Sequence, residues 1–200
     1  MLRDVTGALS HPEQRLSEIA AGRRSPARAG AVVVACGLAA LGLSLLSTLA
    51  EPERADTNRA AGVGFSLALP FLFVAVWVAD AWIIDGVARL MACPGRRRTY
   101  LVTSAFAVPV LVVFEVVRVI QALIDRGGSD TADATATAVG FIDFAVLAWF
   151  VVLLAIAVRA VYGLPAMSAV AAALAPSAVM ATLLVLFLVV ASALHGAGVI

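Results

Sequence analysis

Several ionisable residues lie inside long apolar stretches of this sequence, where each costs about 2.5–3.5 kcal/mol of insertion free energy. A series of carboxylates and arginines across a membrane could relay protons or ions. The same residues could instead pair between helices and extend toward the membrane interface. Because each group nearly balances its own charge, we favour the structural interpretation and keep the relay as the alternative. An inner group comprises Asp80, Asp85, Arg89 and Arg159, and an outer group comprises Glu115, Arg118 and Asp143.

The sequence contains partial matches to enzyme signatures but no complete one. Residues 85–89, DGVAR, are similar to the start of the membrane alcohol-phosphotransferase signature, but one residue is missing and the following CPGRRR carries no carboxylate. Asp80 and Asp143 lack the Gly-x-Gly-Asp context of intramembrane aspartyl proteases. His11 and His195 fall on opposite sides of the expected membrane and cannot form one site. We therefore predict a protein without enzyme activity, catalytic residues, metal or cofactor.

The composition is that of an integral membrane protein. Of 200 residues, 62% are hydrophobic and only 14% are charged, and the mean hydropathy is +1.03. A soluble domain averages roughly 25% charged residues and could not hide so much apolar surface. The net charge of +1 gives no basic field for nucleic acid. Arginine supplies all 14 basic residues, a coding bias that favours a prokaryotic source.

Five apolar stretches are long enough for spanning helices, which need about 20 residues each. Each stretch is continuously apolar rather than alternating, so we expect helices and not barrel strands. The sequence predicts an all-α polytopic bundle with a membrane domain at residues 29–200. Prolines at three positions, Pro70, Pro109 and Pro176, are expected to kink or break their helices. The predicted spans are residues 29–50, 60–91, 100–124, 135–161 and 176–194, the last preceded by a short apolar lead-in at 165–175.

Residues 1–28 form a different, amphipathic segment that we expect in the cytoplasm. Ser10 and Glu13 have the spacing of a helix-capping box. Leu16 and Ile19 then share one helix face, which predicts a helix resting on the membrane surface. A soluble helical tail is the alternative. The long polar lead makes this segment unlike a cleaved signal peptide.

Arginine asymmetry sets the expected topology. The segments before span one, between spans two and three, and between spans four and five hold most of the arginines. The other two loops hold three arginines and a larger number of carboxylates. The positive-inside rule therefore places the N-terminus in the cytoplasm and the C-terminus outside, and every loop agrees with that alternation.

Three segments carry a resemblance to a known family. Residues 11–34 contain a His-Pro, a short amphipathic helix and a basic entry into the first span. Residues 82–112 contain the end of span two, a basic glycine turn and the step Ala105-Phe106-Ala107-Val108-Pro109. Residues 161–175, VYGLPAMSAVAAALA, follow span four. With five spans and about 200 residues, the chain resembles the Yip family, the Ypt/Rab-interacting-protein type, in its compact prokaryotic form.

The resemblance implies a non-enzymatic membrane protein. Eukaryotic members of that family engage prenylated Rab GTPases at Golgi and ER membranes. This chain lacks their long cytosolic N-terminal region, which counts against a Rab-type GTPase as partner. We expect a scaffold or accessory subunit of a transport or envelope complex in a prokaryotic inner membrane. Its partners would be lipids and other membrane proteins or a second copy. A transporter or channel component is the alternative, and a lipid-handling protein is a weaker one.

The predicted topology can be tested by cysteine labelling. An impermeant thiol reagent added from outside should modify a cysteine placed at Ser129 and spare one placed at Thr99. This follows because the arginine asymmetry puts the loop after span three outside and the loop before it inside. The opposite labelling pattern would contradict the orientation, and labelling of both probes or of neither would contradict the assignment of the third span.

Overall fold

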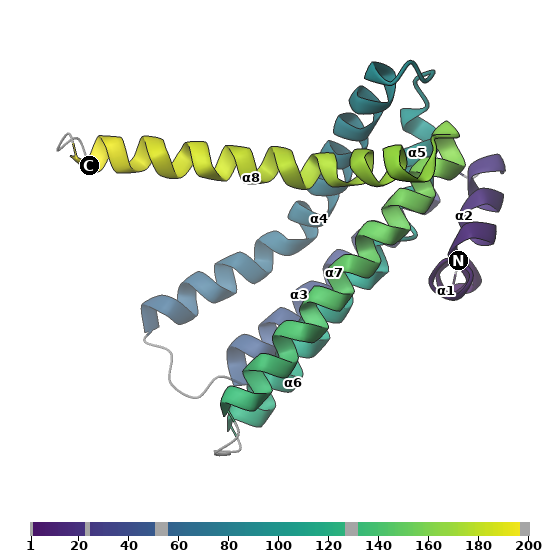
Figure 1. Ribbon diagram of the computed structural model, residues 1–200. Helices are drawn as coiled ribbons and strands as arrows, with labels where there is room; N and C mark the ends of the chain where they lie inside the picture. The colour runs from purple at the N-terminus through teal and green to yellow at the C-terminus, as the bar shows by residue number, and fades with distance from the viewer. Residues whose placement is uncertain (1, 23–24, 51–55, 127–131, 197–200) are drawn as a thin grey trace.

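The computed structural model describes residues 2–22, 25–50, 56–126 and 132–196. Throughout these ranges the ordered elements are helices, and no strand is present among them, which confirms the predicted all-α class. Four helices are long and apolar enough to cross a membrane, and a bent pair supplies the fifth span when counted as one. Figure 1 shows three of the long elements, α3, α6 and α7, running side by side, with α8 projecting away from them.

Helices α3 (Pro26–Ala50) and α4 (Asp56–Leu90) pack closely along their length. The Ser25 hydroxyl caps α3 by accepting a hydrogen bond from the Ala27 amide at 3.2 Å, and Pro26 is the first residue of the helix. Between the two helices, Ser44 Oγ lies 2.8 Å from Ser66 Oγ, and both residues are buried. Hydroxyl pairs of this kind hold helices together where lipid removes the hydrophobic driving force.

The third span is broken rather than continuous. It consists of α5 (Arg97–Ser104), a 3₁₀ turn η1 (Val108–Leu111) and α6 (Val112–Arg126). The chain bends by 43° between α5 and the part that begins at Val108. The expected disturbance at Pro109 lies in this turn, because proline has no amide hydrogen to donate to the preceding helical turn. Leu101 lies in the last turn of α5, and its carbonyl oxygen accepts a hydrogen bond from the Trp77 indole nitrogen at 3.1 Å.

The last two helices are α7 (Ala132–Tyr162) and α8 (Ala166–Gly196). The predicted lead-in at 165–175 and the fifth span form one helix, so Pro176 lies inside α8 and does not begin it. Pro70 likewise lies inside α4. Neighbouring groups can compensate for a proline within a membrane helix, so a proline does not necessarily end one. In Figure 1, α4 bends along its length whereas α8 runs nearly straight.

The amino-terminal segment forms two helices, α1 (Leu2–Ser10) and α2 (Pro12–Ala21). The predicted capping box is wrong: Ser10 ends α1 and donates to the Thr6 carbonyl oxygen, and His11 is the N-cap residue of α2. The expected lipid contact of Leu16 and Ile19 is also wrong, because both side chains are fully covered by protein. An amphipathic face requires an apolar cover, and here the ends of α5 and α7 contribute to it.

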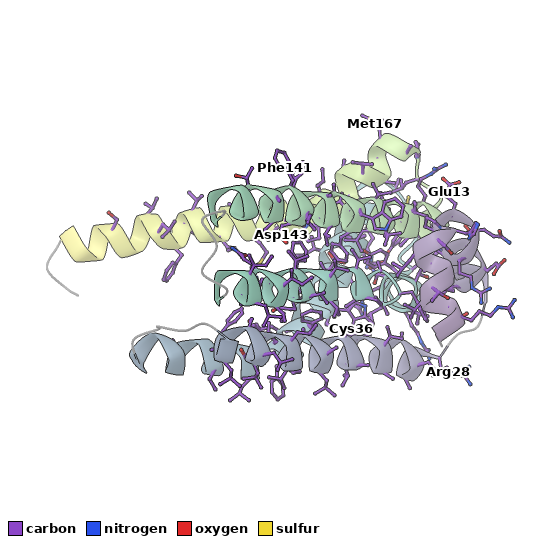
Figure 2. The ribbon with its side chains drawn as sticks, turned by 90° about the horizontal axis from the view of Figure 1, so that it is seen from below. Glu13, Arg28, Cys36, Phe141, Asp143 and Met167 are labelled. Carbon is purple, nitrogen blue, oxygen red and sulfur yellow. The ribbon has the colours of Figure 1, made fainter. Side chains whose placement is uncertain are left out.

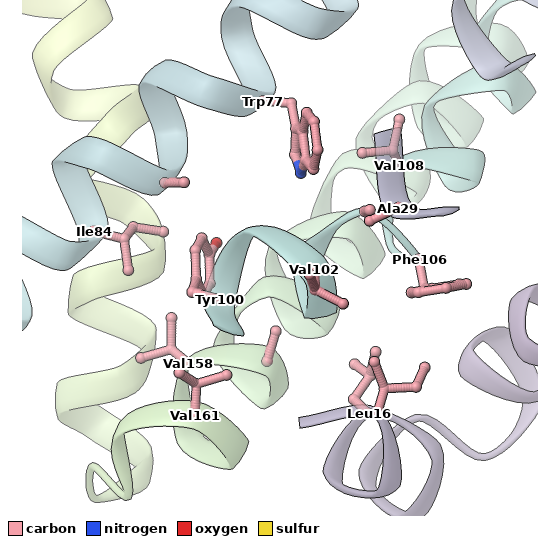
Figure 3. Packing of buried hydrophobic residues seen from close by; sticks show 14 of the residues in the cluster. Leu16, Ala29, Trp77, Ile84, Tyr100, Val102, Phe106, Val108, Val158 and Val161 are labelled. Atoms are coloured by element: carbon pink, nitrogen blue, oxygen red, sulfur yellow. The ribbon is translucent and has the colours of Figure 1, made fainter. Parts of the chain in front are cut away.

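One buried apolar cluster connects the two amino-terminal helices to the membrane helices (Figure 3). Leu16 of α2 packs in the same cluster as Phe106 from the break in the third span and Val161 near the end of α7. Figure 2 shows α1 and α2 at one end of the bundle, together with Arg28 at the start of α3. The arginine-rich segments therefore share one end, and which side of the membrane that end faces remains a prediction.

The close approach of α3 and α4 makes Gly37 sensitive to substitution. A Cβ atom at Gly37 would lie 2.7 Å from the Pro70 Cα atom, which is main chain and cannot rotate away. We expect Gly37→Ala to separate the helices and lower the free energy of unfolding by about 1–3 kcal/mol, the usual cost of overpacking. Gly42→Ala is the matched control, because a Cβ atom there meets nothing within 4 Å. Thermal unfolding in mild detergent would measure both, and equal effects would contradict the proposed close packing.

Candidate functional site

The Asp85 carboxylate is the centre of the inner group. Its Oδ1 atom accepts hydrogen bonds from the Arg96 amide and the Tyr162 hydroxyl, both at 2.9 Å. Its Oδ2 atom accepts from Arg89 Nε at 3.0 Å and lies 2.9 Å from an Arg89 terminal nitrogen. The side chain is only 5% exposed. One buried carboxylate therefore joins the end of α4, the following turn and the end of α7.

The turn after α4 has the geometry that this junction needs. Ala92 adopts a left-handed conformation with φ of 60°, and the Cys93 amide donates to the Ala88 carbonyl oxygen. This is the Schellman arrangement, which usually has glycine at the Ala92 position. Beyond the turn, the Arg96 guanidinium donates to the Val161 carbonyl oxygen at 3.0 Å and so caps α7. Gly163, with φ of +69°, follows the last residue of that helix.

Asp80 precedes Asp85 on α4, away from this junction, and has a different environment. Its Oδ2 atom accepts a hydrogen bond from the Tyr100 hydroxyl at 2.9 Å, and both residues are buried. The Tyr100 ring lies 6.2 Å from the Tyr162 ring, so the two tyrosines connect the surroundings of Asp80 and Asp85. No arginine pairs with Asp80 among the described residues. Asp80 is thus a buried carboxyl group with a hydroxyl partner and no counter-charge.

Arg159 belongs to a different contact. The structure pairs it with Glu13 of α2, at 3.5 Å, rather than with the two aspartates of α4. Both side chains are at least half exposed, so this surface pair is worth little stability by itself. The inner group of the sequence prediction is therefore divided: Asp85 and Arg89 pair directly, Asp80 is bonded to Tyr100, and Arg159 lies at the docking surface of α2.

The outer group is only loosely assembled. Arg118 lies 3.9 Å from Glu115, and its side chain is 57% exposed. Glu115 Oε2 and Asp143 Oδ1 are buried and have no hydrogen-bond partner in the described part of the chain. The predicted contact of Arg118 with Glu115 is thus present. Asp143 has no ion pair with Arg118 in the described structure.

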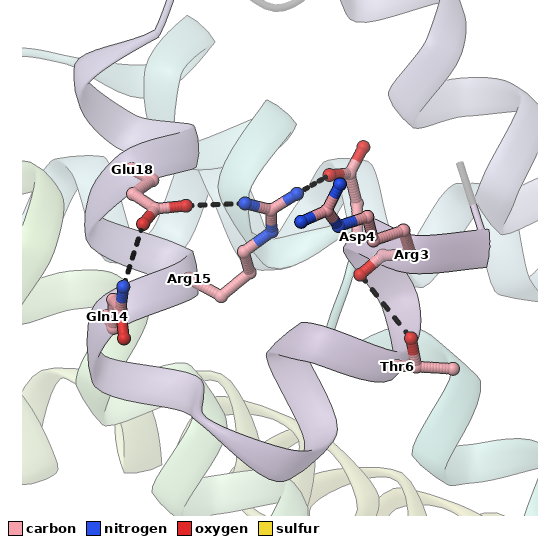
Figure 4. A network of polar contacts seen from close by, with 6 residues as sticks. All are labelled: Arg3, Asp4, Thr6, Gln14, Arg15 and Glu18. Atoms are coloured by element: carbon pink, nitrogen blue, oxygen red, sulfur yellow. Dashed lines mark hydrogen bonds and ion pairs between the residues drawn. The ribbon is translucent and has the colours of Figure 1, made fainter.

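A separate polar network holds the two amino-terminal helices together (Figure 4). Arg15 of α2 pairs with Asp4 of α1 and with Glu18 one turn later in α2. Gln14 donates to the second Glu18 oxygen at 3.1 Å. The hydrogen bond from Arg15 is the main cause that lowers the pKa of Glu18, and the bond from Gln14 adds to it. This network positions the helix whose other face buries Leu16.

A cavity of about 240 Å³ opens beside Asp80. Its walls come from α4, α7 and the break in the third span, and they are almost entirely apolar. Asp80 and Ser104 are the polar residues among those that line it. Glu115, Arg118 and Asp143 are not among the lining residues, so this cavity does not join the two ionic groups.

The two tyrosines are the site residues that the sequence reasoning missed. They are the only tyrosines in the chain. Tyr100 begins the third predicted span, and Tyr162 follows the end of the fourth, where an amphipathic ring with a polar tip is commonly placed. Their position at two helix ends is a signal that could have indicated hydrogen bonding to the aspartates. The described residues contain no group of three histidine, cysteine or acidic side chains placed to hold a metal ion.

The fold and these contacts define an integral membrane protein built from apolar helices, with carboxylates that join helix ends inside the bundle. The Yip1 domain family matches residues 6–189, and the chain therefore belongs to that family. No curated protein and no solved structure matches the chain significantly. The family match confirms the resemblance found in the sequence.

The position of Asp85 generates a stability prediction. Asp85→Ala removes the shared acceptor of Arg89, Arg96 and Tyr162 and leaves their donors unsatisfied. We expect the free energy of unfolding to fall by roughly 2–4 kcal/mol, because the buried Tyr162 hydroxyl and the Arg96 amide lose their acceptor, whereas the Arg89 side chain is 63% exposed. Tyr162→Phe deletes a single hydrogen bond to the same carboxylate and should cost about 1 kcal/mol. Unfolding in detergent would compare them, and similar losses would show that Asp85 does not organise the junction.

Proposed function

We propose that this protein is a non-enzymatic scaffold or accessory subunit of a larger membrane complex, with α8 as its contact surface for other membrane helices. The observation that carries the proposal is that most of α8 does not pack against other helices of the described chain. Only 12% of its apolar window is buried within the chain, compared with 39% for α3. In Figure 1, α8 leaves the bundle after its first turns. The family match supports a membrane protein and is compatible with this role.

The composition of the projecting part of α8 suits helix association. Small exposed residues at Ser177 and Ala181 are one helical turn apart, a spacing that lets two helices approach closely in lipid. Large apolar side chains flank them, including Leu183 and Phe187, which are 54% and 67% exposed. The partner would be another integral membrane protein or a second copy of this chain.

The two alternatives have weaker support. A transporter or channel component would use the carboxylates as a path, and the unpartnered oxygens of Glu115 and Asp143 are the observation in its favour. The cavity beside Asp80 does not extend to them, which favours the scaffold. For location, we propose the inner membrane of a prokaryote with the arginine-rich end in the cytoplasm, on the basis of the arginine distribution.

The scaffold proposal predicts that a larger side chain on α8 weakens its association with other helices. Ala181→Phe should reduce the recovery of co-purifying membrane proteins or of the self-associated form, because a large side chain separates closely packed helices. Ala145→Phe is the matched control, since Ala145 is an exposed alanine on α7. Purification in mild detergent after cross-linking in native membranes would measure both variants. Equal retention in the two variants, or an unaccompanied monomer in the parent protein, would contradict the proposal.

Flux measurement separates the scaffold from the transporter. Purified protein in sealed vesicles should carry no proton or ion current above that of empty vesicles. A current that Asp143→Asn abolishes, while the thermal stability is unchanged, would favour the transporter instead.

A further inference from the structure

We infer that the cavity beside Asp80 is a binding site for a lipophilic cation: a compact apolar molecule that carries one ammonium group and enters from the bilayer. The site is formed where α4, α7 and the broken third span meet. This inference goes beyond the scaffold role and does not depend on it.

The depth of Asp80 is the first step. Asp80 is ten residues from Leu90, the last residue of α4, which is about 15 Å along the helix axis. Asp80 lies within the apolar stretch of α4, Ala61–Leu90, that is long enough to cross a membrane. An ionisable residue at such depth is costly and marks a functional site unless a partner compensates it.

The available partner does not compensate a charge at Asp80. The Tyr100 hydroxyl occupies Oδ2, and no other described side chain bonds to this carboxylate. The contrast with Asp85 is direct, because Asp85 has an arginine and two further donors within 3.0 Å. A carboxylate with one hydroxyl donor is complementary to a ligand that brings a positive charge.

The walls of the cavity specify the rest of the ligand. Phe73, Trp77 and Phe150 are three aromatic residues among the lining side chains, and Val108 and Leu154 complete an apolar surface. Aromatic faces attract ammonium groups, and the effect is stronger where water is excluded. Leu72 and Val76, which also line the cavity, are 41% and 57% exposed, so the cavity is accessible from the lipid-facing side of α4.

The source of the cation is the bilayer interior and not a lipid headgroup. An aminophospholipid carries its ammonium group in the interfacial region, whereas the cavity is lined almost entirely by apolar side chains of the membrane helices. A free amphiphilic amine that partitions into the hydrocarbon can bring its charged group to this depth when the carboxylate neutralises it.

A single-tryptophan variant provides the measurement. Trp82→Phe together with Trp149→Phe leaves Trp77, which lines the cavity, as the only tryptophan. This protein in phosphatidylcholine nanodiscs is titrated with decylammonium and with decanol, which has the same chain length and no charge. We expect a saturable change in Trp77 fluorescence with decylammonium and an affinity for decanol weaker by at least about tenfold.

Substitution at Asp80 tests the recognition itself. Asp80→Asn keeps an oxygen that can accept the Tyr100 hydrogen bond but removes the charge. We expect it to weaken decylammonium binding by about tenfold or more and to abolish the preference over decanol. Asp143→Asn is the matched control, because that carboxylate does not line the cavity, and its decylammonium affinity should equal that of the parent.

Several outcomes would overturn the inference. They are an absence of saturable binding in the folded parent protein, equal affinity for the two ligands, and unchanged affinity in Asp80→Asn. Competition by phosphatidylethanolamine added to the nanodiscs would identify a headgroup as the occupant and would also contradict it. If Asp80→Asn fails to fold, Tyr100→Phe decides instead. It removes the hydroxyl partner and keeps the carboxylate, so decylammonium binding should persist, and its loss would contradict the inference.

Discussion

The buried Asp85 carboxylate is the interaction on which the arrangement of the helix ends depends. It joins α4 to the turn that begins the third span and to the end of α7, which are 11 and 77 residues away in sequence. Arg89 supplies the counter-charge, with a terminal nitrogen 2.9 Å from the carboxylate. In a bilayer, apolar side chains gain little by leaving lipid for a neighbouring helix. Directed polar contacts at the helix ends therefore contribute more to specificity than apolar area does.

Much of the fold follows from hydropathy. Continuous apolar stretches of sufficient length locate α3, α4, α7 and α8, and Pro109 indicates the disturbed third span. The single helix through Pro176 was not predicted, because the sequence does not reveal which neighbouring groups compensate a proline. Hydropathy also does not distinguish whether lipid or protein covers Leu16 and Ile19. Lipid and protein are equally apolar, so the same helical pattern fits a helix on the membrane and a helix docked on α5 and α7.

The polar contacts were less predictable than the spans. Arg89 follows Asp85 by one helical turn, so that pair could be read directly from the sequence. The hydrogen bond from the Arg96 amide to Asp85 could not be read from the sequence, because every residue except proline has a main-chain amide donor. Arg159 was grouped with the aspartates since it ends a span on the same predicted side. Depth along a helix does not fix the direction in which a side chain points, and Arg159 points toward Glu13 of α2.

The docking of α2 imposes an order on the assembly of the chain. The apolar face of α2 is synthesised first, but Val158 and Val161, which share its buried cluster, follow Ile19 by about 140 residues. At synthesis rates of about 5–20 residues per second, that interval is roughly 7–28 s. During this time the face of α2 lacks the part of its cover that α7 supplies, and the membrane surface is an apolar phase close to it. The amphipathic pattern thus describes an early resting place for the helix, and the docked position becomes available only once the fourth span has been inserted.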